Sequence, residues 1–192
     1  MKARKSPMKF FPLFVGALVV LSASPVFCDN RVDINVSNAG IISPGNDSLS
    51  SRVLFKFDLP SKLSDKRIDY AEVVFKAKID TLSRYSVMFA GYPVTSDWNK
   101  ASVSWSGTWT NEGGDYNDSL YEIGLIKARG DDQVRFDITR LVRSWQQESI
   151  PNYGLIIIPV EEERRITKLV HPFGFPQGVF AKVIIYFSYT HP

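Results

Sequence analysis

The chain has 192 residues and a formal net charge of +3 at pH 7. This length favours a single domain, and one cysteine, Cys28, excludes a fold held together by intrachain disulfides. Residues 1–28 hold four basic and no acidic side chains, so residues 29–192 would carry 19 basic against 20 acidic ones, a net charge of −1, which gives no indication of nucleic-acid binding.

The N-terminus has the layout of a secretory signal peptide. Basic residues come first, and an apolar run at 10–21 follows them. This run of 12 residues is shorter than the roughly 20 that a membrane-spanning helix needs. We therefore expect secretion, with 1–28 as signal peptide, 29–192 as one mature domain, and no transmembrane segment in that domain. Cleavage after Cys28 and lipidation of Cys28 both stay open.

Short alternating or β-branched segments separated by turn residues follow along the chain. Residues 52–57 place Val53, Phe55 and Phe57 on one face, and 70–78 alternate in the same way. Further strands are expected at 86–92, 120–126, 134–136, 154–159 and 181–189. The apolar run at 155–158 is typical of a strand that is covered on both faces. The pattern predicts an all-β sandwich or barrel.

One segment has the period of a helix. Leu141, Val142 and Trp145 form an apolar stripe between 139 and 147, and Asp137 or Thr139 can cap its start. Pro151 follows shortly after the expected end. We expect a short helix near residues 139–147, lying against the edge of the sandwich.

Five segments in order resemble the DNRLRE domain family, with which carbohydrate-binding module family 96 is grouped. They are Arg-Val-Leu-Phe-Lys-Phe-Asp-Leu at 52–59, Ala-Glu-Val at 71–73, Trp98 with Val-Ser-Trp at 103–105, Phe-Asp-Ile-Thr with Trp145 at 136–145, and Asn-Tyr-Gly-Leu at 152–155. The resemblance covers roughly residues 30–190. It implies a jelly-roll β-sandwich at the cell surface or outside the cell. It also implies binding of an acidic polysaccharide such as alginate, without catalysis.

Aromatic residues are the first candidates for contact with a ligand. Trp98, Trp105 and Trp145 occupy positions of the resemblance, and we expect them to fill the interior. Trp109 and Tyr116 lie instead in the longest polar loop, 106–119. An exposed indole there could stack on a sugar ring, although loop aromatics also serve to hold the loop against the domain.

Basic residues would matter for a polyuronate, because Arg and Lys bind carboxylates. The candidates are Lys76, Lys78, Arg84 and Lys100. A structural calcium ion is the one cofactor considered, with Asp115, Asn117 and Asp118 as weak oxygen ligands; an Asx-rich turn explains the same residues.

No nucleophile motif or phosphate-binding loop is present, so we expect no enzyme activity. The preferred hypothesis is a secreted, non-catalytic carbohydrate-binding module whose partners are extracellular polysaccharides or cell-surface components, and not nucleic acid. The alternative is a structural protein of the cell surface or extracellular matrix that assembles without binding sugar. An exposed apolar patch would favour assembly, and a cluster of basic residues with an exposed aromatic would favour sugar.

Overall fold

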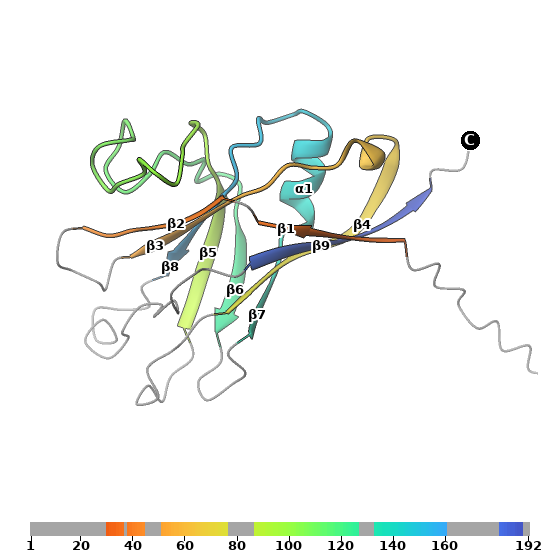
Figure 1. The fold of residues 1–192 in the computed structure, drawn as a ribbon. Helices are drawn as coiled ribbons and strands as arrows, with labels where there is room; N and C mark the ends of the chain where they lie inside the picture. The colour runs from red at the N-terminus through yellow and green to blue at the C-terminus, as the bar shows by residue number, and fades with distance from the viewer. Residues whose placement is uncertain are drawn as a thin grey trace, which may run out of the picture.

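The computed structural model describes residues 30–36, 38–44, 51–76, 87–126, 133–160 and 181–189. These residues form two antiparallel sheets, one α-helix and a short 3-10 helix, η2 (Ser61–Leu63) (Figure 1). The four-stranded sheet has the order β1 (Arg31–Asn35), β9 (Ala181–Tyr189), β4 (Lys66–Lys76), β7 (Gln133–Asp137). The five-stranded sheet has the order β2 (Asn38–Ile42), β3 (Arg52–Lys56), β8 (Leu155–Pro159), β5 (Val87–Pro93), β6 (Glu122–Ile126).

The order of the strands is that of a jelly roll. When β2 is set aside, β1 pairs with the last strand, β9, while β3 pairs with β8 in the other sheet. The chain then places β4 and β7 in the first sheet and β5 and β6 in the second. Eight antiparallel strands that alternate between two packed sheets in this way form the jelly-roll arrangement. The prediction of an all-β, jelly-roll-type sandwich is confirmed.

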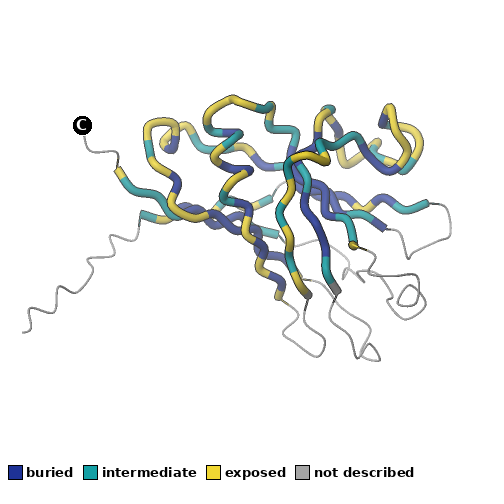
Figure 2. Tube along the Cα trace, turned by 180° about the vertical axis from the view of Figure 1, so that it is seen from behind, coloured by how far each residue is buried: buried dark blue, intermediate teal, exposed yellow. Residues whose placement is uncertain are grey.

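The main core lies between the two sheets. Alternate residues of each strand point inward, as the period of an extended chain requires, and the two inner faces meet through aromatic side chains. The ring centroids of Phe89 and Phe136 lie 4.9 Å apart, and those of Phe55 and Phe75 lie 5.3 Å apart. Strand interiors are therefore buried, whereas the connecting loops carry much of the exposed surface (Figure 2).

Helix α1 (Thr139–Gln146) confirms the predicted helix. Its stripe of Leu141, Val142 and Trp145 is buried against the main core, and Trp145 meets Phe57 edge to face at 5.6 Å. Polar contacts orient the helix on β4, since the Thr139 hydroxyl oxygen accepts a hydrogen bond of 2.9 Å from the backbone nitrogen of Ala71. Among the described residues, no helix has the length and apolar character that a membrane crossing requires.

The connection between β5 and β6, residues 94–121, folds back over the outer face of the five-stranded sheet (Figure 1). Trp98 and Trp109 of this loop are buried on Ile42, Leu54 and Ile156, the outward-pointing residues of three neighbouring strands, and form a second apolar cluster. Strand β8 is thus covered on both faces, as its unbroken apolar sequence predicts.

Two strands were not predicted, and one begins four residues before its predicted start. Strands β1 and β2 are five residues each, and Gly40, Asn35 and Asn38 lower the strand propensity of their sequence. Strand β4 begins at Lys66 and not at residue 70, because a bulge between Ile68 and Tyr70 interrupts the alternation while pairing with β9 continues. The predicted signal peptide, residues 1–28, lies outside the described residues.

Candidate functional site

A hollow of about 320 Å³ opens at one end of the four-stranded sheet. It is lined by the end of β1, the start of β9, the end of β4 and the start of β7. The lining residues are Asn35, Val36, Val74, Phe75, Lys76, Gln133, Ala181 and Lys182. We call this hollow the sheet-end pocket.

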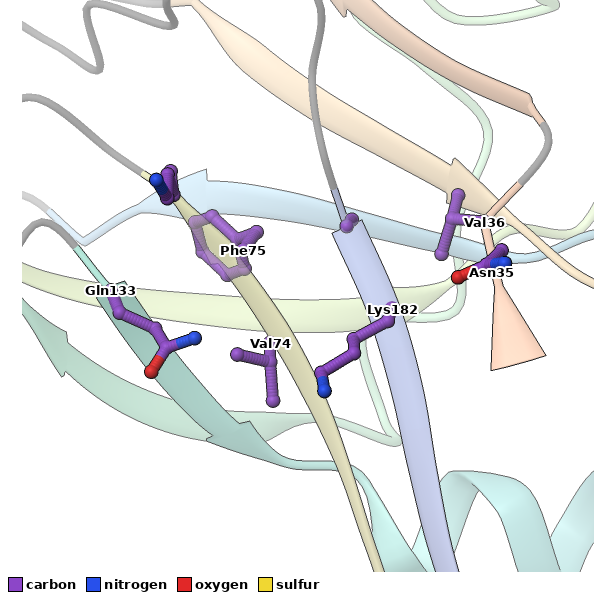
Figure 3. A pocket seen from close by; sticks show the side chains of 8 residues that line it. Asn35, Val36, Val74, Phe75, Gln133 and Lys182 are labelled. Atoms are coloured by element: carbon purple, nitrogen blue, oxygen red, sulfur yellow. The ribbon is translucent and has the colours of Figure 1, made fainter. Parts of the chain in front are cut away.

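Strand register brings these distant residues together. Lys182 of β9 is paired with Asn35 on one side and with Val74 on the other, and Lys76 is paired with Gln133. Alternation in each strand then directs Lys76, Val74 and Lys182 to the outer face. Figure 3 shows the ammonium group of Lys182 and the side-chain amide of Gln133 on either side of Val74. The pocket thus has an apolar floor with polar groups at its sides.

The chemistry of the lining favours an anion. Two ammonium groups, from Lys76 and Lys182, and two amides, from Asn35 and Gln133, supply hydrogen-bond donors, and no carboxylate is among the lining residues that the structure describes. Lys182 is 3.4 Å from the Asp33 carboxylate, a loose and half-exposed ion pair. Such pairs contribute little to stability, so the ammonium group can exchange partners at small cost.

The next row of residues along the sheet contains three carboxylates, and each has a partner. Asp33 binds Arg31 at 2.6 Å, and this hydrogen bond lowers the pKa of the Asp33 carboxyl below its usual range. Glu72 is almost fully buried and binds Arg135 at 2.5 Å. Asp137 accepts hydrogen bonds from the backbone nitrogen and the hydroxyl of Thr139. Partnered carboxylates repel an approaching anion less than free ones would.

Two tyrosines lie farther along the same face. The rings of Tyr70 and Tyr186 are 6.1 Å apart, and the guanidinium of Arg31 lies 5.8 Å from the centre of the Tyr186 ring. Burial, together with the nearby carboxylate of Glu72, raises the pKa of the Tyr70 hydroxyl to about 12. Tyr186 follows Lys182 by four positions on strand β9, a distance of about 13 Å. The pocket and the tyrosine pair could therefore contact one extended molecule that lies along the strand.

Of the four basic residues predicted as ligand contacts, Lys76 lies in the sheet-end pocket. Lys100 is exposed on the 94–121 loop, where its backbone nitrogen donates to Asn38 of the other sheet. Lys76 thus belongs to the four-stranded sheet, and Lys100 belongs to the loop that covers the five-stranded sheet. Lys78 and Arg84 lie outside the described residues.

The two predicted aromatic contacts pack within the molecule. Trp109 is 8% exposed, and its indole nitrogen donates to the Ser104 carbonyl oxygen at 2.8 Å, so little ring area is open to a sugar. Tyr116 is partly buried, with its ring 4.9 Å from that of Tyr92 and 5.7 Å from the guanidinium of Arg52. This geometry favours the alternative explanation for Trp109, that the loop aromatic holds the loop against the sheet.

The predicted calcium ligands accept hydrogen bonds within the loop. Asp115 accepts bonds of 2.9 Å from the backbone nitrogens of Thr110 and Asn111. Asn117 accepts one from the backbone nitrogen of Ser119, the geometry of an Asx turn, and Asp118 is exposed beside it. Burial acts to raise the pKa of the Asp115 carboxyl, but these hydrogen bonds outweigh burial and lower the pKa. Within the described ranges, no three acidic, histidine or cysteine side chains form a group that could hold a metal ion.

The sequence reasoning missed Asn35, Gln133 and Lys182. Lys182 shares the outward alternation of Ile184 and Tyr186, which could have placed it on that face. Asn35 lies in a strand that was not predicted. Its proximity to Lys182 depends on a pairing between the first and last strands, which no local pattern reveals.

No family model matches the chain, and no curated protein matches it. The resemblance to the DNRLRE family therefore rests on the five ordered segments alone.

Proposed function

We propose that the protein is a secreted, non-catalytic module that binds an acidic polysaccharide through the sheet-end pocket. The observation that carries the proposal is the lining of that pocket, in which Lys76 and Lys182 stand beside the amides of Asn35 and Gln133, with no carboxylate among the lining residues that the structure describes. Ammonium groups and amide N–H groups are the donors that a uronate carboxylate or a sulfate ester accepts from.

The shape of the surrounding face supports a polymer as the ligand. An extended chain that starts at Lys182 and follows β9 would reach the Tyr70–Tyr186 pair after about 13 Å. Tyrosine rings offer an apolar face to the C–H groups of a sugar. The ligand would thus be held by charge at one end of the face and by ring contact at the other.

The test is affinity electrophoresis and calorimetry with a polyuronate such as alginate and with a neutral glucan. We expect binding of the polyuronate that weakens as salt rises, because exposed charge pairs are screened. Lys76→Gln and Lys182→Gln should each weaken binding about three- to fivefold, the range of an exposed ion pair. Lys100→Gln is the matched control, since it removes an exposed lysine of the 94–121 loop that is outside the described lining of the pocket, and it should leave binding unchanged.

Two results would overturn the proposal. One is the absence of binding to any acidic polymer at low salt. The other is binding that Lys100→Gln weakens and that the two pocket variants leave intact. Silence towards both acidic and neutral polymers, together with self-association of the protein, would support the alternative of a structural protein that assembles outside the cell.

A further inference from the structure

A buried carboxylate lies on the outer face of the four-stranded sheet. Glu72 of strand β4 is 4% exposed, although it occupies an outward position in the alternation of that strand. Among the residues that the structure describes, it is the only charged side chain that is buried. Burial of a charge costs free energy unless the charge is paired and hydrogen-bonded. The partners of Glu72 therefore indicate what a carboxylate does at this position.

Both partners of the Glu72 carboxylate are side chains that reach solvent. Its Oε1 accepts a hydrogen bond of 2.5 Å from Nη1 of Arg135, and its Oε2 accepts one of 3.4 Å from the Tyr70 hydroxyl. The side chain of Arg135 is 57% exposed, and Tyr70 is 38% exposed. One buried carboxylate thus holds two exposed groups of different chemistry, a cation and an aromatic ring, on the same face.

Arg135 lies in the same row across the sheet as one of the pocket lysines. It is paired with Val74 on one side of β4, and Lys182 is paired with Val74 on the other side. Because neighbouring strands are about 4.8 Å apart, the Cα atoms of Arg135 and Lys182 are about 10 Å apart. An extended anionic chain that crosses the pocket along this row passes both cations.

The guanidinium group of Arg135 keeps donors for a ligand. A guanidinium carries several N–H donors in a planar fork, and among the described residues only Glu72 accepts a hydrogen bond from Arg135. The fork matches a carboxylate bidentately, whereas a lysine acts as a point charge. Because Glu72 already holds the fork in one orientation, less side-chain entropy is lost when a ligand binds.

We propose that Arg135 is a second anion contact of the polysaccharide site and that Glu72 is its positioning residue. The inference rests on the proposed function, because it adds to the sheet-end pocket one cation of β7 that is outside the described lining. Glu72 does not touch the ligand; it orients Arg135 towards a ligand carboxylate and holds the Tyr70 ring on the same face. The ligand class is a polyuronate with several carboxylates along its chain, since Lys182 and Arg135 bind one each.

The direction in which Glu72→Gln changes binding tests this assignment. The substitution removes a negative charge from the face, so charge alone predicts equal or tighter binding of an anionic polymer. If Glu72 orients Arg135, binding should instead weaken about two- to threefold, and Arg135→Gln should weaken it about three- to fivefold. Calorimetry with alginate gives the dissociation constants, at a temperature at which circular dichroism shows that each variant is folded.

The double variant separates positioning from a general structural role. Once Arg135 is replaced by glutamine, adding Glu72→Gln should cause no further loss of affinity, because Glu72 acts through Arg135. A disturbed face would give additive losses instead. Asp69→Asn is the matched control, since it breaks the exposed pair of Arg67 and Asp69 at 3.2 Å on the same strand, and it should not weaken binding.

Three results would each overturn the assignment of Glu72 and Arg135. They are equal or tighter binding by Glu72→Gln, wild-type affinity in Arg135→Gln, and additive losses in the double variant. If Lys76→Gln and Lys182→Gln weaken binding in the same experiment, the proposed function stands while this inference fails. Absence of binding by the wild-type protein overturns the proposed function, and the inference with it.

Discussion

The two outer faces of this sandwich differ in how they meet their surroundings. The outer face of the four-stranded sheet carries charged and polar side chains such as Arg31, Glu72 and Lys182, which form ion pairs within a strand or across strands. The outer face of the five-stranded sheet is largely apolar, and the 94–121 loop covers part of it with Trp98 and Trp109. One sheet therefore faces water directly, whereas the other uses its longest connection as a third layer.

This difference separates the two surfaces that a ligand or partner could reach. A polar face stays open without a covering segment, so a pocket for a soluble anion can form at its end. An apolar face has to be covered, and the part that the chain leaves open is best suited to another protein surface. The sheet-end pocket lies on the polar face, whereas the exposed side chains of Tyr121, Ile123 and Leu125 lie on the part of the apolar face that the loop leaves open.

The third layer should contribute strongly to stability, and Trp98→Ala measures that contribution. Trp98 is buried in the second cluster, and its indole nitrogen donates to the Tyr153 carbonyl oxygen at 2.8 Å. Truncation would leave a cavity and an unsatisfied carbonyl, so we expect the free energy of unfolding to fall by about 3–5 kcal/mol. Urea unfolding followed by circular dichroism provides the measurement.

Trp105→Ala is the control within the same loop. Trp105 is only partly buried, and its main contact is the guanidinium of Arg52 at 4.8 Å from the ring. We expect Trp105→Ala to lower the free energy of unfolding by about 1–2 kcal/mol. If Trp98→Ala and Trp105→Ala lowered the free energy of unfolding equally, the loop would not form a packed layer. The two outer faces would then not differ in the way described.

On the polar face, stability should depend on an ion pair and not on a covering loop. Glu72 is 4% exposed, and Arg135 supplies its cation. Arg135→Met leaves a buried carboxylate without its partner, and we expect a loss of about 1–2 kcal/mol because Arg135 itself is half exposed. Thermal and urea unfolding at neutral pH measure the change.

A double-mutant cycle with Glu72→Gln isolates the interaction between the two side chains. The double variant should be less destabilised than the sum of the two single variants. Arg67→Met, which breaks the exposed pair with Asp69, is the matched control and should change stability by less than about 0.5 kcal/mol. Additive effects of Glu72→Gln and Arg135→Met would contradict the proposed pairing.

The sequence predicts the fold well where local patterns carry the information. Alternating or β-branched segments identified β3, β5, β6, β7 and β9 within a few residues, an unbroken apolar run identified β8, and an apolar stripe identified α1. Strands β1 and β2 were not predicted, because their short segments contain asparagine and glycine and have weak strand propensity. Glu72 was predicted to point outward, and it does, but its burial depends on Arg135, which is 63 residues away along the chain.

The candidate site was less predictable, because it depends on register between distant strands. Lys76 was identified from its own strand, whereas Lys182 joins it only through the pairing of β4 with β9. Trp109 was selected because its loop is polar, and a polar loop can still bury one indole on an apolar sheet. Exposure is a tertiary property that the composition of a segment does not determine.

The smallest expected effect concerns the pH dependence of the covering loop. Asp115 holds the loop through the backbone nitrogens of Thr110 and Asn111, and its pKa is lowered in the folded state. A carboxyl with a lowered folded pKa stabilises the protein above its unfolded pKa, and this contribution is lost as pH falls through the folded value. Asp115→Asn should therefore lower the free energy of unfolding by about 1 kcal/mol or less at pH 7. The loss is modest because the carboxylate is partly exposed.

The same variant should match the wild type once the pH is low enough to protonate Asp115. Urea unfolding followed by tryptophan fluorescence, repeated from neutral to acidic pH, gives both curves. Asp118→Asn is the control, since Asp118 is an exposed neighbour whose carboxylate accepts a long hydrogen bond of 3.4 Å from the hydroxyl of the adjacent Ser119. A difference between Asp115→Asn and wild type that stays constant with pH would mean that the carboxylate charge does not hold the loop, because only a charge that titrates can make the difference vanish.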